Sequence, residues 1–295
     1  MKGKGINFRK ILPFLLLIPT LFVIITFIYI PAADSFEMSF NRENKFGTRT
    51  IFVGTENYGK IFTDPEYLSI FGFTAVYVGL TVFITVFLSF FLALLLNKNV
   101  PGSYVYRALI FIPYAVSPAI AGTLWTFMLD PVAGHVNYII TALFGQQIAW
   151  LTTEPYAFIA LLAATVWKML PFDIVFYIAG LQSVPDDLLE SATLDGAGAF
   201  TKIWKIKFPL VSPITFYLVI MNIIAAMFRS FATIDVMTGG GPGGYTTTMM
   251  YKVYLDAFSY QKMGIASAES VVMFIMMAIV TVIYFIYGQK NVYYR

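Results

Sequence analysis

The sequence predicts an all-α, polytopic membrane protein with six transmembrane helices. Of its 295 residues, 59% are hydrophobic and only 12% are charged, whereas soluble domains are about 45–50% apolar and about 25% charged. Several uncharged runs also reach the roughly 20 residues that a helix needs to cross the hydrocarbon layer of a bilayer. These observations argue against an ordinary soluble domain.

The six predicted spans follow from the apolar runs in chain order. Four spans contain no charged residue and no histidine: 11–30, 68–96, 108–129 and 209–228. The span at 157–181 carries Lys168 and Asp173, and the last one, uncharged over 270–287, is expected to begin near Gly264. We expect the first span to be retained in the protein, because its apolar run is longer than the core of about 7–15 residues in a cleavable signal.

The distribution of basic residues predicts which ends of the spans face the cytoplasm. With the N-terminus inside, 11 Lys and Arg residues fall in cytoplasmic segments and 7 in outside segments. The cytoplasmic segments are then 1–10, 97–107, 182–208 and 288–295, and the outside segments are 31–67, 130–156 and 229–263. Because short cytoplasmic loops carry the excess of Lys and Arg, we expect both termini inside the cell.

A polar stretch at 183–208, named the elbow below, interrupts the apolar runs and is typical of a helix–turn–helix. Pro185 can begin a helix, because its missing N–H would be unpaired there in any case. Gly196 supplies the left-handed turn that ends this helix. A second short helix is expected from about 199 to 207, and Pro209 marks the start of the next span.

Four polar residues of the predicted spans are candidates for a transport site. They are Lys168, Asp173, Asn222 and Arg229. Charge in hydrocarbon is costly and usually functional. Two interpretations stay open: these side chains line a polar translocation path, or they pair within and between helices while Arg229 snorkels to the interface.

The sequence offers no catalytic or metal-binding constellation. His135 is the only histidine and cysteine is absent, so a His/Cys metal cluster or a Ser–His pair is not available. The glycine-rich stretch 238–245 lacks the Gly-Lys-Ser/Thr of a phosphate-binding loop, which indicates a simple turn. We therefore expect neither a metal site nor a nucleotide site in this chain.

The elbow carries a recurring set of residues at fixed spacing. They are Glu190, Ser191, Ala192, Gly196, Ile206, Phe208 and Pro209. This spacing resembles the cytoplasmic signature of binding-protein-dependent ABC importer permeases, written Glu-Ala-Ala, then Gly, then Ile-x-Leu-Pro, with Ser191 replacing Ala and Phe208 replacing Leu. The stretches 167–172 and 237–242 are similar to segments of carbohydrate-type permeases, and the resemblance covers most of 68–290.

The resemblance implies the type I ABC importer permease fold and a place in the cell membrane of a prokaryote. Such a permease, similar to the maltose and glycerol-3-phosphate types, translocates a sugar or oligosaccharide by alternating access. The implied partners are a second homologous permease, an extracellular solute-binding protein and two ATPase subunits, which use ATP and Mg²⁺. The implied segments are an N-terminal tail, first span and outside loop at 1–67, the permease core at 68–290 and a cytoplasmic tail at 291–295.

In that interpretation the elbow couples ATP hydrolysis to movement of the spans. The expected coupling residues are Leu188, Leu189, Glu190, Ser191, Ala192, Asp195, Gly196, Ala197, Ile206 and Pro209. The apolar members would pack on an ATPase, and the small ones would permit a tight turn.

Three alternatives remain open at the level of sequence. An ion-coupled secondary transporter would also place Lys168 and Asp173 near the middle of the membrane. A membrane enzyme would need a nucleophile–base or metal cluster that the sequence does not offer. Finally, the partner permease could make most of the contacts to the substrate.

Overall fold

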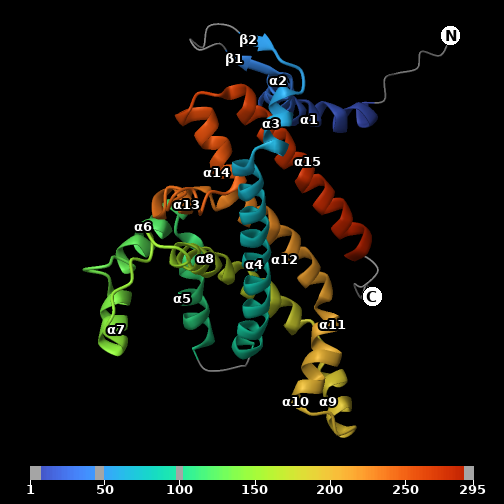
Figure 1. Cartoon of the computed structure of the whole chain (residues 1–295). Coiled ribbons are helices and arrows are strands. Elements are labelled where there is room, and N and C mark those ends of the chain that lie inside the picture. The colour runs from blue at the N-terminus through green and yellow to red at the C-terminus, as the bar shows by residue number, and fades with distance from the viewer. Residues whose placement is uncertain (1–7, 44–49, 98–101, 289–295) are drawn as a thin grey trace, which may run out of the picture. The chain divides into compact units, whose positions relative to one another are not determined.

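The computed structural model describes residues 8–43, 50–97 and 102–288. Most of these residues are helical, with one small two-stranded sheet (Figure 1). The chain forms two compact units, one built from Met1–Asp64 with Val253–Ile275 and the other from Pro65–Lys252 with Met276–Arg295. The predicted tail at 291–295 lies outside the described residues, and the functional division after residue 67 stays a prediction.

The first unit begins with one long apolar helix made of three segments. They are α1 (Phe8–Ile24), the π-helical turn η1 (Ile25–Tyr29) and α2 (Ile30–Met38). The span predicted at 11–30 therefore continues past Pro31, and its membrane-spanning candidate is Leu15–Met38. Pro31 does not stop the helix, because it lies in the first turn of α2, directly after a π turn that has already shifted the hydrogen-bond ladder.

Two short strands and a short helix complete the N-terminal part of this unit. Strand β1 (Asn41–Glu43) pairs antiparallel with β2 (Thr50–Phe52), and α3 (Glu56–Thr63) follows. The buried side chain of Asn57 on α3 donates to the backbone oxygen of Asn41 at 2.9 Å. This hydrogen bond fixes α3 against β1.

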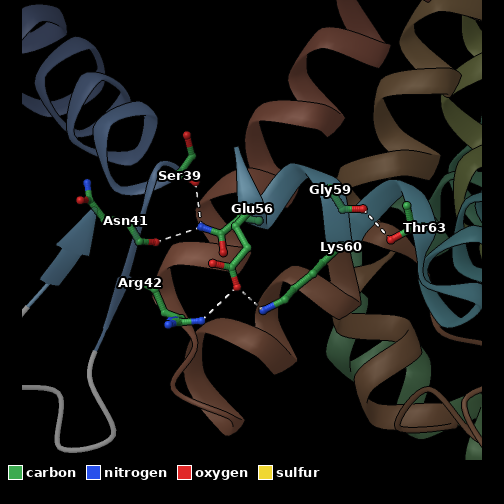
Figure 2. A network of polar contacts seen from close by, with 8 residues as sticks. Ser39, Asn41, Arg42, Glu56, Gly59, Lys60 and Thr63 are labelled. Carbon is green, nitrogen blue, oxygen red and sulfur yellow. Dashed lines mark hydrogen bonds and ion pairs between the residues drawn. The ribbon is translucent and has the colours of Figure 1, made fainter. Parts of the chain in front are cut away.

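Glu56 lies at the centre of a charged network at the start of α3 (Figure 2). Its carboxylate accepts from Arg42 and from Lys60, each at 3.0 Å. The hydrogen bond from Lys60 and the positive charge of Arg42 hold the pKa of Glu56 below its usual value. All three side chains are exposed, so the network connects β1 to α3 but adds little to stability.

The second unit contains most of the membrane-spanning helices. In chain order its elements are α4 (Pro65–Leu96), α5 (Ser103–Ala115), α6 (Pro118–Met128), α7 (His135–Phe144), α8 (Tyr156–Gln182), α9 (Asp186–Leu194), α10 (Ala199–Lys202), η2 (Ile203–Lys207), α11 (Phe208–Leu210), α12 (Ser212–Ile224), η3 (Ala225–Arg229) and α13 (Phe231–Met237). The last three elements are divided between the two units: α14 (Met249–Tyr254), η4 (Leu255–Ser259) and α15 (Met263–Gly288).

The described residues contain five helices long and apolar enough to cross a membrane, and a sixth candidate that is bent. The five are Leu15–Met38, Pro65–Leu96, Tyr156–Gln182, Ser212–Arg229 and Met263–Ile286. The sixth is the pair Val105–Ala115 and Pro118–Met128, which is bent by 100°. The predicted all-α, polytopic architecture is confirmed.

The third predicted span, at 108–129, is wrong as a continuous helix. Pro118 has no N–H and disfavours helical backbone in the residue before it. Val116 and Ser117 are accordingly extended, with ψ of 140° and 152°. The side chain of Ser117 accepts from the N–H of Ile120 and begins α6. The run is apolar throughout, but proline chemistry breaks it into two helices.

The core of the second unit lies where α4, α8 and α12 meet. Hydrogen bonds between side chains join these helices, among them Tyr77 with Thr165 at 2.7 Å and Tyr177 with Thr215 at 3.0 Å. Leu218 on α12 is fully buried among the apolar side chains of this core. The three helices therefore form one packed body.

The glycine-rich stretch 238–245 forms a closed turn after α13, in agreement with the sequence. Four of its glycines have φ values between 54° and 88°, a region that residues with a Cβ rarely adopt. The hydroxyl of Thr246 donates to the backbone oxygen of Gly241 at 2.6 Å and helps to close the turn.

Gly122 permits the close approach of α6 and α13. A Cβ at this position would lie 3.2 Å from the Cβ of Val236. We expect Gly122→Leu to lower the free energy of unfolding by about 1–3 kcal/mol, as overpacking does in other cores. Thermal unfolding in detergent measures the effect. The matched control is Gly79→Leu on α4, where a Cβ meets nothing within 4 Å; equal losses in both variants would contradict the explanation.

Candidate functional site

The elbow folds into the helix–turn–helix that the sequence predicts. The N–H of Gly196 donates to the oxygen of Thr193 at 3.0 Å, and that of Ala197 to the oxygen of Ala192 at 2.8 Å. This pair of hydrogen bonds is a Schellman motif, and it ends α9. Gly196 has a φ of 81°, which costs a residue with a Cβ conformational strain. The backbone alone therefore defines a tight turn between α9 and α10.

The elbow is joined to the membrane-spanning core and to itself. Leu189 on α9 packs against the core cluster. The ring of Trp204 on η2 lies 6.4 Å from that of Phe90 on α4. Lys202 on α10 donates to the hydroxyl of Thr193 on α9 at 2.7 Å and links the two helices. A displacement of the elbow would therefore be transmitted to α4.

The elbow exposes large apolar side chains. Leu194 is 90% exposed and Phe200 is 75% exposed, while Leu188 is 39% exposed. Exposed apolar side chains gathered on a short segment are typical of a surface that another protein covers. Leu194 and Phe200 flank the predicted turn but are not among the predicted coupling residues, whereas Leu189 is one of them and packs inward.

The other predicted coupling residues divide between the surface and the interior of the elbow. Glu190, Ser191, Asp195 and Gly196 are exposed, and Ala192, Ala197, Ile206 and Pro209 are half-buried. The exposed set follows α9 to its C-terminal turn. The half-buried set supports that turn and the start of α11.

A cavity of about 560 Å³ lies beside the break between α5 and α6. Its walls also come from α8, α12, η3 and α13. Lys168, Asn222 and Arg229 line it, so three of the four predicted substrate-pathway residues meet at one place. The fourth, Asp173, is fully buried and is not part of the lining.

Lys168 points to the end of α5 and not to Asp173. Its ammonium donates to the backbone oxygens of Val116, Pro113 and Tyr114, at 2.5, 3.2 and 3.4 Å. These carbonyls lie where the helix ends and lacks its own donors. Lys168 and Asp173, the two charged residues of α8, therefore have different partners and do not pair with each other.

Asp173 pairs with Asn222 across the contact between α8 and α12. The amide of Asn222 donates to one carboxylate oxygen of Asp173 at 2.5 Å. The other oxygen, Oδ1, has no hydrogen-bond partner among the described residues. The interpretation as a pair between helices therefore describes these two residues better than a direct role in the cavity.

Arg229 stands apart from the other three candidates. Its side chain is exposed and lines the cavity, and no hydrogen bond or ion pair to it occurs within the part of the chain that the structure describes. Tyr114 and Phe172 line the same cavity, with their rings stacked at 5.4 Å. A guanidinium presents a planar set of donors that fits a carboxylate or a phosphate, so the cavity suits an anionic ligand.

Comparison with known proteins gives one consistent result. Residues 85–291 match the family described as "Binding-protein-dependent transport system inner membrane component". The chain is 37% identical to the sn-glycerol-3-phosphate transport system permease protein UgpA of Agrobacterium fabrum, over 97% of each chain.

Two solved structures share the fold. One is a bacterial ABC transporter involved in the import of the acidic polysaccharide alginate, with a TM-score of 0.84, 21% identity and 96% of each chain covered. The other is a bacterial alginate ABC transporter in complex with a periplasmic protein that holds an alginate pentasaccharide. Its TM-score is 0.82, with 21% identity and 94% of this chain and 93% of that chain covered.

Asn222→Leu would leave the buried carboxylate of Asp173 without its described partner. We expect this variant to lose about 1–3 kcal/mol of stability, because an unsatisfied buried polar group retains its full desolvation cost. The double variant Asp173→Leu/Asn222→Leu removes both polar groups and should recover part of the loss. Thermal unfolding of the three proteins in detergent decides the question. A double variant less stable than Asn222→Leu would contradict this assignment.

Proposed function

Because the chain belongs to the binding-protein-dependent transport system inner membrane component family, we propose that it is the permease subunit of an ATP-driven importer for anionic sugar derivatives. The observation that carries the proposal is the elbow, which is closed by its own backbone, packs on the core through Leu189 and exposes the large apolar side chains of Leu194 and Phe200. A segment of this kind suits a partner that moves the membrane-spanning helices.

The proposed complex contains four kinds of subunit. This chain pairs with a second homologous permease, and two ATPase subunits bind ATP and Mg²⁺ and dock on the elbows. A solute-binding protein delivers the ligand from outside. The excess of basic residues in the segments 1–10, 97–107, 182–208 and 288–295 supports a cytoplasmic elbow and cytoplasmic termini.

The elbow would act as a rigid connection between the ATPase and the spans. Leu188, Leu194 and Phe200 supply apolar surface for the ATPase, and Glu190 is available for a basic group. Because Trp204 contacts α4 and the elbow continues directly from α8, closure of the ATPase pair would move both helices. Alternating access follows when these helices change the opening of the cavity.

The substrate class is inferred from the cavity and from the relatives together. The lining includes Lys168 and Arg229 but no carboxylate. The compounds that the similar transporters are named for, sn-glycerol-3-phosphate and alginate, are both anionic. We infer a phosphorylated or acidic sugar derivative, with Arg229 as its main charged contact from this chain. The partner permease would complete the binding surface.

Membership of the family favours this function over the two others considered. An ion-coupled secondary transporter has no need of the elbow. Asp173, the buried carboxylate it would use, is bonded to Asn222 and lies outside the cavity lining.

Gly196→Trp should uncouple ATP hydrolysis from uptake while membrane insertion persists. Tryptophan at position 196 would strain the left-handed turn, because a residue with a Cβ rarely adopts its φ. It would also add bulk to an open surface, since a Cβ there meets nothing within 4 Å. Uptake and ATP hydrolysis by the assembled complex in proteoliposomes are the measurements, and we expect uptake to fall about tenfold or more.

Gly145→Trp is the matched control for this substitution. Gly145 ends α7 with a φ of 69°, and a Cβ there also meets nothing within 4 Å. It carries the same kind of backbone strain but lies outside the elbow. Normal uptake by correctly assembled Gly196→Trp complexes, or equal losses in both variants, would count against the proposed role.

Arg229→Gln should weaken the uptake of anionic substrates selectively. A charge-assisted hydrogen bond contributes about 1.5–3 kcal/mol, so the KM for a sugar phosphate should rise about tenfold or more. Uptake of a neutral sugar by the same complex should change little, and Arg229→Lys should retain part of the affinity. A KM that is unchanged in Arg229→Gln would remove this residue from the substrate site.

A further inference from the structure

The break between α5 and α6 leaves backbone carbonyls without the donors that a continuous helix would give them. In a continuous helix the oxygen of Tyr114 would accept from the N–H of residue 118, but that residue is Pro118 and has none. Val116 is extended, so its own oxygen leaves the helical ladder as well. Lipid offers no donor to such carbonyls, so within a membrane they need one from the protein or from water in a cavity.

The ammonium of Lys168 supplies these donors. It reaches the oxygens of Pro113, Tyr114 and Val116, within 2.5–3.4 Å. Three acceptors match the three N–H groups of an ammonium, which has no acceptor of its own. A positive charge is also favourable at the C-terminal end of a helix, where the macrodipole is negative. The side chain therefore satisfies both the geometry and the charge of the break.

This arrangement sets Lys168 apart from Arg229 in the same cavity. The donors of Lys168 are directed at the backbone, whereas Arg229 has no partner among the described residues. Tyr114, Val116 and Pro118 all line the cavity. A residue that fixes the end of α5 therefore fixes one wall of the cavity.

We propose that Lys168 is a positioning residue that caps α5 and holds the bend between α5 and α6, and so shapes the substrate cavity without being its main charged contact. The part of this proposal that concerns transport rests on the proposed function. The part that concerns the bend does not, and it can be tested in the absence of any substrate.

The absence of cysteine from the natural sequence permits a direct test of the bend. Spin labels at Val105→Cys on α5 and Phe127→Cys on α6 occupy exposed positions on the two arms. An unbent helix would separate these residues by about 33 Å, at 1.5 Å per residue. Double electron–electron resonance spectroscopy on the assembled complex in lipid nanodiscs measures the distance between the two spin labels.

We expect one short distance population in the labelled parent and in Lys168→Arg, whose guanidinium keeps donors and charge. Lys168→Met should broaden the distribution toward longer distances. Arg229→Met is the matched control, because it removes the other cation of the cavity and should leave the distance unchanged. If Lys168→Met does not assemble, Lys168→Gln, which keeps two donors but no charge, should show a partial broadening.

Transport kinetics provide a second readout on the same variants. Lys168→Met should lower kcat for anionic and neutral sugars alike, whereas Arg229→Met should raise KM for anionic sugars. A distance distribution in Lys168→Met and in Lys168→Gln identical to that of the parent would overturn the proposal. So would a KM increase confined to anionic substrates in Lys168→Met. If the parent complex transports no sugar while Lys168→Met still broadens the distance distribution, the result would contradict only the proposed function.

Discussion

The hydrocarbon layer offers no water to polar groups, and the middle of α8 meets this constraint by bonding its polar side chains to neighbouring helices. Thr165 is bonded to Tyr77 on α4, Lys168 caps α5, and Asp173 accepts from Asn222 on α12. In an apolar surrounding each of these contacts is directional and costly to break. Together they fix the positions of the helices around α8, and the cavity lies between those helices.

The same helix connects the cavity to the elbow. Lys168 lies on the wall of the cavity, and α8 ends at Gln182, a few residues before α9 begins at Asp186. Leu189 and Trp204 then return the elbow to the core. In the proposed function, α8 would therefore connect an ATPase docked on the elbow to the wall of the substrate cavity.

The sequence predicted the features that depend on local chemistry. Uninterrupted apolar runs located the spans, and Pro185 and Gly196 located the helix and the turn of the elbow, because their backbone effects do not depend on distant residues. The break at Pro118 was missed, since its run is as apolar as a true span and a proline inside a membrane helix is tolerated when a neighbour satisfies the freed carbonyls.

Tertiary contacts explain the remaining differences. Lys168 lies some fifty residues after the carbonyls of Pro113 and Val116 to which it donates, and no local sequence pattern predicts that contact. The inward packing of Leu189 and the exposure of Leu194 likewise depend on how α9 sits on the core, which helical periodicity alone does not fix. The sequence named Lys168, Asn222 and Arg229, which all line the cavity. It could not show which of them holds the helices in place and which is available to a ligand.

The most direct test of the central claim asks which side of the membrane the elbow faces and what covers it. Leu194→Cys places a single thiol on its most exposed apolar position in a chain without other cysteines. A membrane-impermeant maleimide should label it in inverted vesicles and not in right-side-out vesicles, and assembly with the ATPase subunits should suppress the labelling. Labelling from the outside, or labelling that the ATPase subunits leave unchanged, would contradict the account.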